Sequence, residues 1–269
     1  MGHAGTLDPE ATGVLPVLLG QGTRLIEFLA EATKVYKAEI ELGIATDTYD
    51  ATGKVTQRSD VSSLTREQVE TALSSFSGFV DQTPPMYSAV KHKGIPLYRW
   101  ARAGVELPRK ARRVEFSRLE IIDWHLPLLT LDVECSKGTY IRSLAHDMGQ
   151  KLGCGAHLRN LVRLKSGPFH ISDAVNITKL EDAFRQGYWS EIIYPMDVAV
   201  LHLQMMTVDE DSERAITNGQ SLALVTGGEV STKLCRAYSR DGRFIALLRY
   251  DVERGHWRPE KVFGKSSKT

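Results

Sequence analysis

The sequence has little of several features that mark particular classes of protein. Its 269 residues include three cysteines, Cys135, Cys154 and Cys235, and no CxxC pair. So sparse and odd a set argues against a disulfide framework and is typical of a reducing compartment. No apolar run approaches the length of a transmembrane helix, and no signal-peptide pattern is visible. We therefore expect a cytoplasmic protein without a membrane partner.

Familiar nucleotide and metal motifs are also missing. There is no GxGxxG, no Walker A loop and no HExxH. The stretch from Cys154 to His157 lacks a second pair of ligands, so we expect no zinc site. Asp47 and Asp50 lie in a Gly-containing loop that does not match an EF-hand, and a solvated turn explains them better than a cation site.

Positive and negative charges nearly balance over the whole chain, but the positive charges are concentrated in one segment. The formal net charge is +1, so an anionic partner must be held by a local patch. One segment combines many cations with Tyr87, Tyr98 and Trp100, which are the ingredients of an RNA surface. A solvated charged face with its rings turned inward fits the same pattern. The cations that we expect to bind RNA are Lys91, Arg99, Arg102, Arg109, Lys110, Arg112, Arg113 and, from a second cluster, Arg163.

Apolar periodicity predicts a mixture of helices and strands. The predicted helices are Thr23–Ala32, Thr65 to about Phe76, Pro96–Ala103, Ile141–Leu152 and one that starts at Thr178. The predicted strands are Lys34–Gly43, Leu128–Cys135, and short strands within Ala237–Tyr250 and Trp257–Phe263, with a turn at Asp241-Gly242. Without regular βαβ alternation, this order favours an α+β fold with a mixed or antiparallel sheet. We expect one domain over residues 1–200 and a small, mostly β domain over 201–269.

The opening stretch, MGHAGTLDPEATGVLPVLLG, raises a question about Asp8. Asp8 followed by Pro9 and Glu10 is typical of a helix N-cap, or of a turn. The glycines around it permit close approach by a ligand, and a histidine such as His3 can donate or accept a hydrogen bond. These residues alone leave the capping role and a reactive role open.

Separated motifs occur in the order and spacing of one known family. They are Gly2-His3-Ala4-Gly5-Thr6-Leu7-Asp8-Pro9 with Ala11-Thr12-Gly13, then Lys34-Val35-Tyr36, Cys135 to Arg142, and Gly155 to Leu164. From Gly2 to about Phe169 the chain resembles the TruB family of bacterial tRNA pseudouridine synthases. The final segment resembles, less closely, the small PUA-like RNA-binding domain of that family.

The resemblance implies an activity and a partner. Members isomerise a uridine at position 55, in the T-loop of tRNA, to pseudouridine after flipping the base out of its stack. The partner would be the T-arm stem-loop, gripped by an insertion at about residues 84–113. No metal or organic cofactor is implied, because breaking and remaking the bond is redox-neutral. No protein partner is implied either.

The resemblance also implies roles for individual residues. Asp8 would be the catalytic carboxylate. Arg142 would pair with it. Tyr36 would stack on the flipped base and help to move a proton, and without the resemblance Tyr36 and Leu161 would be interpreted as core. The remaining implied residues are Tyr140 and Leu161, which would line the pocket, and His3, which would help to hold the RNA loop open.

The chain departs from the family in one respect, and two other functions fit parts of the sequence. Family members normally carry a few dozen residues before the Gly2 motif, and we expect their absence here to expose a sheet edge and lower stability. One alternative is a hydrolase that uses Asp8 with Asp47 or Asp50. The other is a non-catalytic RNA-binding or RNA-folding protein, which would leave uridine unchanged.

Overall fold

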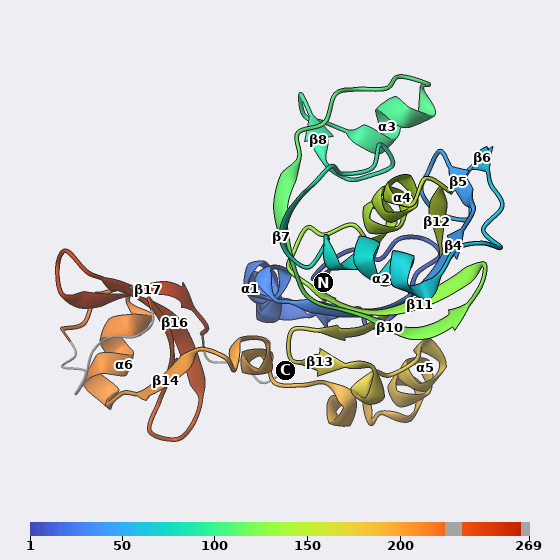
Figure 1. Ribbon diagram of the computed structural model, residues 1–269. Coiled ribbons are helices and arrows are strands. Elements are labelled where there is room, and N and C mark those ends of the chain that lie inside the picture. Colours follow the sequence, from blue (N-terminus) through green and yellow to red (C-terminus); the bar gives the residue numbers. More distant parts are fainter. Residues whose placement is uncertain (224–232, 265–269) are drawn as a thin grey trace. The chain divides into compact units, whose positions relative to one another are not determined.

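A computed structural model describes residues 1–223 and 233–264 of the chain (Figure 1). It contains two compact units, and the chain passes back and forth between them. The larger unit holds Gly5–Pro16 and Ala30–Ala174. The smaller unit holds Met1–Ala4, Val17–Leu29 and Val175–Thr269. These units do not test the predicted domain boundary between residues 200 and 201, which stays a prediction.

The larger unit is built on a seven-stranded sheet, in the order β13-β12-β4-β11-β10-β7, with β2 beside β12. Neighbouring strands are antiparallel, except that β2 runs parallel to β12. The sheet is therefore mixed, and the predicted α+β class is confirmed. The strands are β2 (Thr12–Gly13), β4 (Lys34–Leu42), β7 (Gly78–Gln82), β10 (Arg112–His125), β11 (Leu128–Cys135), β12 (Ala156–Ser166) and β13 (Phe169–His170).

Two amphipathic helices cover one face of this sheet, α2 (Arg66–Ser74) and α4 (Ile141–Lys151) (Figure 1). Alternate residues of β4, such as Ala38 and Ile40, are fully buried beneath them. Leu144 and Met148 of α4 join the same core. The core thus anchors α4, whose first turn carries Arg142 at the edge of the buried region.

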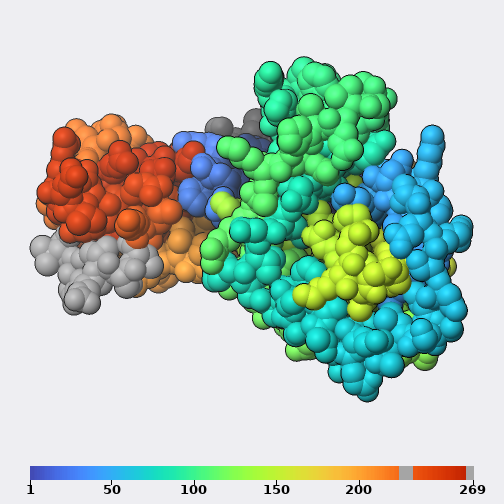
Figure 2. All heavy atoms as spheres, turned by 45° about the horizontal axis from the view of Figure 1, so that its top comes forward, coloured from blue at the N-terminus to red at the C-terminus, as the bar shows by residue number. Residues whose placement is uncertain are grey.

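A lobe stands out from the sheet between β7 and β10, where the sequence places the expected RNA-gripping insertion at about 84–113 (Figures 1 and 2). It contains β8 (Lys91–His92), β9 (Ile95–Pro96) and α3 (Leu97–Arg102). A second small hairpin, β5 (Ile44–Thr46) with β6 (Val55–Arg58), follows β4. Neither piece contributes a residue to the main core cluster of the larger unit.

The smaller unit contains a four-stranded sheet, β14 (Gln204–Thr207), β15 (Leu234–Tyr238), β16 (Phe244–Asp251) and β17 (His256–Val262). Helix α6 (Glu210–Thr217) packs on it through Ile216, against Trp257 and its neighbours. The predicted small strand-rich part is confirmed. The other elements are β1 (Gly2–His3), β3 (Val17–Leu18), η1 (Gly20–Leu25), α1 (Ile26–Glu31, which extends past the division), α5 (Ile177–Gln186), η3 (Trp189–Ile192) and η4 (Met196–Val200); η2 (Ile171–Asp173) belongs to the larger unit.

Several local expectations need correction. Of the two local interpretations of Asp8, the helix N-cap is wrong and the turn is confirmed, because residues 8–11 form a turn closed by the Ala11 N–H donating to the Asp8 carbonyl at 2.9 Å. Helix α5 is capped by Asn176, not by Thr178, since the Asn176 side chain accepts from the Lys179 N–H. The strands β10 and β12 were not predicted. Both contain bulges, and a bulge interrupts the alternation by which a strand is recognised.

Candidate active site

The centre of the site is an ion pair between Asp8 and Arg142. Nε and Nη2 of Arg142 donate to the two carboxylate oxygens of Asp8, each at 2.8 Å. The Arg142 side chain is 6% exposed whereas that of Asp8 is 38% exposed. A bidentate pair of this kind fixes the plane and direction of the carboxylate. The carboxylate is therefore held from below and remains accessible from outside.

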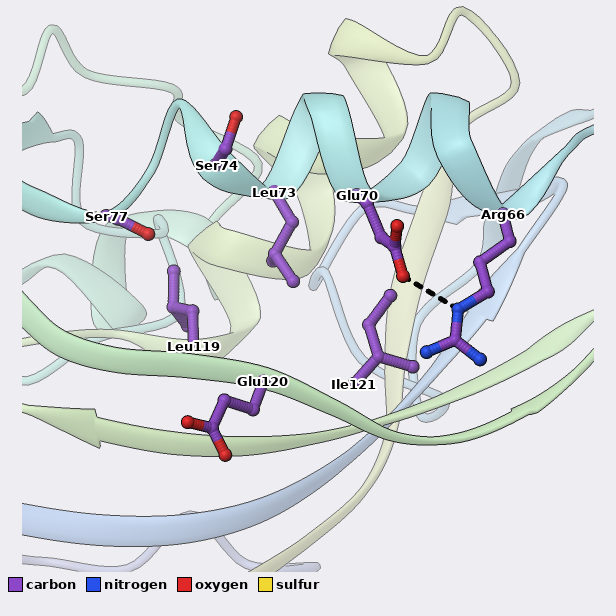
Figure 3. A pocket seen from close by; sticks show the side chains of 8 residues that line it. All are labelled: Arg66, Glu70, Leu73, Ser74, Ser77, Leu119, Glu120 and Ile121. Atoms are coloured by element: carbon purple, nitrogen blue, oxygen red, sulfur yellow. Dashed lines mark hydrogen bonds and ion pairs between the residues drawn. The ribbon is translucent and has the colours of Figure 1, made fainter.

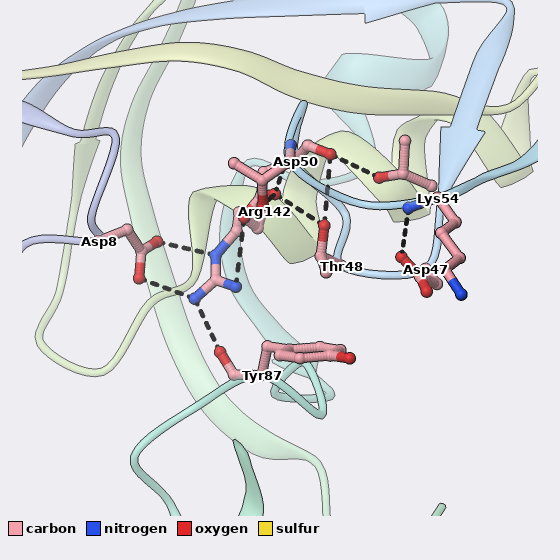
Figure 4. A network of polar contacts seen from close by, with 9 residues as sticks. Asp8, Asp47, Thr48, Asp50, Lys54, Tyr87 and Arg142 are labelled. Carbon is pink, nitrogen blue, oxygen red and sulfur yellow. Dashed lines mark hydrogen bonds and ion pairs between the residues drawn. The ribbon is translucent and has the colours of Figure 1, made fainter. Parts of the chain in front are cut away.

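Arg142 has two further partners, which sequence reasoning missed (Figure 4). Its Nη2 donates to the Tyr87 carbonyl at 3.0 Å, and its Nη1 lies 3.6 Å from Oδ2 of Asp50. Asp50 itself accepts from the hydroxyls of Thr48 and Thr52 at 2.7 and 2.6 Å. The guanidinium is thus surrounded on three sides, and its charge is shared by two carboxylates.

The loop that carries Asp8 is held at both ends by Arg163. This side chain is 1% exposed, and it donates to the Gly5 carbonyl at 3.0 Å and to the Val14 carbonyl at 2.6 Å. Gly13 has φ of +101°, and a Cβ on it would lie 2.2 Å from the Arg163 carbonyl, so only glycine fits there. Arg163 was expected to bind RNA. The structure corrects this, because a buried guanidinium that is bonded to backbone has no surface to offer a phosphate.

Tyr36 lies in β4 between Val133 of β11 and Arg163 of β12. Burial raises the pKa of its hydroxyl, and the charge of Asp8 raises it further, whereas Arg163 acts in the opposite direction. The hydroxyl therefore stays protonated at neutral pH and is able to donate a hydrogen bond.

The remaining expected site residues are distributed unevenly. Tyr140 is the N-cap residue of α4, two positions before Arg142, and is half-buried. Leu161 lies in β12 opposite Ala38 and is 8% exposed. His3 is exposed on β1, which belongs to the smaller unit. The structure thus brings Tyr140 and Arg142 together on one turn, while the roles of these residues stay predictions.

Most of the expected RNA-binding cations lie on the surface of the lobe or at its base. The exposed ones are Lys91, Arg99, Arg102, Lys110, Arg112 and Arg113. Arg109 differs, because it is half-buried, donates to the Pro84 carbonyl at 3.1 Å and pairs with Glu106. Two of the exposed guanidiniums lie over rings, Arg102 over Tyr98 and Arg113 over Phe79. Those rings are thus partly engaged within the protein.

A hollow between α2 and β10 is lined by none of the expected site residues (Figure 3). An Arg66–Glu70 ion pair of 2.7 Å lies along its rim, and the Leu73, Leu119 and Ile121 side chains form its apolar part. Within residues 1–223 and 233–264, no cluster of three or more His, Cys, Asp or Glu side chains is arranged to hold a metal ion. Over the same residues, no helix is both long and apolar enough to cross a membrane.

Two family models, which together cover residues 1–201, assign the chain to one family. The family model of the TruB family pseudouridylate synthase N-terminal domain matches residues 1–141, and that of the tRNA pseudouridylate synthase B C-terminal domain matches residues 142–201. A tRNA pseudouridine synthase B from Dehalococcoides mccartyi is 45% identical over 98% of this chain and 87% of its own. One from Geobacter sulfurreducens is 45% identical over 81% of this chain and 72% of its own.

Solved structures agree with the family match. A chain of a Cbf5-Nop10-Gar1 complex is 27% identical, with a TM-score of 0.74 over 98% of this chain and 76% of that one. A chain of an H/ACA RNP bound to a substrate RNA containing 2'-deoxyuridine is 24% identical, with a TM-score of 0.71 over 99% and 77%. The second likeness concerns the fold alone.

Proposed function

The chain belongs to the TruB family of pseudouridylate synthases, and from that premise we propose that it converts the uridine at position 55 of tRNA, in the T-loop, to pseudouridine. The observation that carries the proposal is the half-exposed Asp8 carboxylate, held bidentately by the buried Arg142. An enzyme that acts through a carboxylate needs it ionised, aimed and open to the substrate. Neither the hydrolase nor the non-catalytic RNA binder gains support from the relatives.

The reaction moves one bond and consumes nothing. The bond from N1 of uracil to C1′ of ribose breaks, the base turns, and C5 bonds to C1′; C5 then loses its proton and N1 gains one, so that atoms and charge balance. Asp8 acts on the nucleotide, while Arg142 keeps the carboxylate in a single orientation throughout. Tyr36, whose hydroxyl stays protonated, stacks on the flipped base and donates a hydrogen bond or relays a proton. Tyr140 and Leu161 line the same pocket.

We further propose that the T-arm stem-loop is the substrate element and that the lobe binds it. Seven exposed cations over residues 91–113 supply phosphate contacts in a chain whose net charge is only +1. His3 helps to hold the RNA loop open. The Cbf5 relative was solved with Nop10 and Gar1, whereas we propose that this chain acts in the cytoplasm without a required protein partner.

Substitution of Asp8 tests the proposal. Asp8→Asn keeps the size of the side chain but removes its charge and its reactivity, so pseudouridine formation on an unmodified tRNA transcript should fall by at least about a thousandfold. Thermal stability and tRNA affinity should change little, because neither depends on the reacting oxygen. The product is measured as a mass-neutral change from uridine.

Asp47→Asn is the matched control. The Asp47 carboxylate accepts a hydrogen bond from the Lys54 N–H, at 2.8 Å, and should be dispensable for turnover (Figure 4). Appreciable turnover by Asp8→Asn, after deamidation has been excluded, contradicts the proposal. Cleavage of the glycosidic bond with release of uracil would instead favour the hydrolase.

A further inference from the structure

One buried glutamine, Gln82, forms hydrogen bonds with both the backbone carbonyl and the backbone N–H of Tyr140. The Gln82 Nε2 donates to the Tyr140 carbonyl at 3.0 Å, and the Tyr140 N–H donates to Gln82 Oε1 at 2.8 Å. Gln82 is 4% exposed, so these bonds are shielded from water. Tyr140 is the N-cap residue of α4, and it has no capping bond from its own side chain. Gln82 therefore fixes the point at which α4 begins.

Two more bonds tie the chain just after Gln82 to the same helical turn. The Ser143 hydroxyl donates to the Thr83 carbonyl at 2.8 Å, and Ser143 is 1% exposed. The Arg142 guanidinium donates to the Tyr87 carbonyl at 3.0 Å. Three residues of α4 and its cap, 140, 142 and 143, are thus bonded to residues 82, 83 and 87. We call these contacts the Gln82 clasp.

The clasp lies where the lobe joins the sheet. Gln82 is the last residue of β7 and pairs in register with Arg112, the first residue of β10. The lobe leaves and re-enters the sheet at this pair. The backbone of Gln82 therefore belongs to the root of the lobe, and its side chain belongs to the first turn of the helix that carries Arg142.

We propose that Gln82 is a positioning residue for the Asp8–Arg142 pair, an inference that rests on the proposed function. By setting the start of α4, Gln82 sets the direction in which Arg142 leaves the helix and hence the orientation of the Asp8 carboxylate. The same clasp joins that orientation to the root of the RNA-binding lobe. Gln82 touches neither the substrate nor the reacting atoms.

Gln82→Glu tests the proposal with almost no change of shape. The carboxylate still accepts from the Tyr140 N–H but faces the Tyr140 carbonyl with an oxygen instead of a donor. We expect the single-turnover rate of pseudouridine formation to fall about tenfold or more, with the tRNA dissociation constant within about twofold of the parent chain. Gln57→Glu, the same change at a glutamine of β6 that donates to Ser59, is the control and should leave the rate unchanged.

A double-mutant cycle separates positioning from general destabilisation. In an Arg142→Lys background, Gln82→Glu should slow the reaction much less than in the parent chain, because the group that it orients is already gone. If the two effects on the rate multiply in full, or if the rate constant of Gln82→Glu matches the parent, the proposal is overturned. Should Gln82→Glu fail to fold, Ser143→Ala takes its place, with a smaller expected fall in rate and the same non-additivity.

Asp8→Asn is measured in the same series, so that the two proposals can fail separately. Full turnover by Asp8→Asn overturns the proposed function. An inactive Asp8→Asn together with a fully active Gln82→Glu overturns the role of Gln82 alone.

Discussion

At the scale of the residue, Arg163 is a cation that is buried and bonded to backbone carbonyls, whereas the cations of the lobe are mostly exposed. Arg163 reaches two carbonyls, those of Gly5 and Val14, which lie at either end of the loop that carries Asp8. A planar guanidinium can donate in two directions at once, whereas an ammonium on a flexible stem cannot keep both carbonyls in place. One side chain from another strand therefore holds both ends of the loop, in addition to the backbone pairing of β2 with β12.

Arg163→Lys should accordingly lower both the unfolding free energy and the turnover. Hydrogen bonds to a charged group contribute about 1.5–3 kcal/mol, so we expect a loss of about 2 kcal/mol in chemical denaturation. The affinity for tRNA should hold, because the side chain is buried. Arg159→Lys, on the same strand but 49% exposed and paired with Glu39 and Glu41, should cost less than about 1 kcal/mol. A steep loss of tRNA affinity in Arg163→Lys without loss of stability would contradict this account.

Asp147 offers a prediction about pH. Burial raises the pKa of this carboxyl to about 6 in the folded protein, whereas in an unfolded chain it is about 4. Between those values the folded state holds more protons than the unfolded state, so this group lowers stability as pH rises from about 4 to 6. Asp147→Asn should therefore raise the melting temperature at pH 7, and the gain should vanish below about pH 4.

Thermal melts from pH 4 to pH 8 check this prediction. Asp211→Asn is the control, since its side chain is 92% exposed and should not change the profile in the same way. An Asp147→Asn protein that melts with the parent at every pH would show that the Asp147 carboxyl is not desolvated in solution.

The sequence was informative about single residues where they belong to a motif. The expected pairing of Arg142 with Asp8 is present, although only the resemblance, and not the spacing of 134 positions, pointed to it. Arg163 was misjudged because a sequence shows that a residue is basic but not that its guanidinium is buried. The contacts of Gln82 with Tyr140 and of Arg142 with the Tyr87 carbonyl could not be foreseen, because each involves a backbone group and a backbone group has no signature in the sequence.

At the scale of the element, local rules predicted those parts whose periodicity is unbroken. The capping box of Thr65 and Gln68 is present at the start of α2, and β4 and β11 alternate as expected. In β12, by contrast, Arg159 and Asn160 are both exposed at a bulge, so buried and exposed residues fall out of step. For that reason the alternation of apolar and polar residues did not predict β12, the strand that pairs with β4.

The exposed cations of the lobe lead to a prediction about how the affinity for RNA depends on salt concentration. Lys110, Arg112 and Arg113 are exposed at its return to the sheet, and replacing all three with Gln removes up to three phosphate contacts. The slope of log affinity for a T-arm stem-loop against log salt should then become shallower by about two to three. Arg109 is left in place, because it supports the Pro84 carbonyl and its loss would disturb the fold of the lobe.

Binding titrations at several salt concentrations measure that slope. The matched control replaces Lys54, Arg58 and Arg66, three exposed cations of the β5–β6 hairpin and α2, with Gln. An equal change of slope in both triple variants would mean that the lobe is not the principal contact surface.

At the scale of the whole molecule, the order of the chain does not follow the two units. Residues 17–29 belong with the C-terminal part, where the Arg24 guanidinium lies over the Phe263 ring and Glu27 pairs with Lys261 at 2.8 Å. Composition and periodicity carry no information about which distant segments meet, so the sequence could not show that residues 17–29 join the C-terminal part. No single cut separates the units.

Ending the chain after Ala174 should therefore fail to give a well-behaved catalytic unit. Every proposed catalytic residue would be retained, but Leu25, buried in the full chain, would lose its surroundings along with the rest of 17–29. We expect aggregation or a markedly lower melting temperature, measured by light scattering and thermal melts. Lys261→Gln in the full chain, which removes only a surface ion pair, should melt close to the parent. A soluble, cooperatively melting 1–174 protein would contradict the expectation.

The interleaving of the units also has a consequence for synthesis on the ribosome. The larger unit becomes complete when Ala174 has emerged, and its sheet can form while the rest of the chain is still being translated. The segment 17–29 emerges among the first residues and must wait for the last strands, β16 and β17, to be made. A nascent chain stalled near Ala174 would thus contain a complete sheet and an apolar segment, 17–29, whose packing partners have not yet been made. Such an exposed apolar segment would be a binding site for chaperones until translation ends.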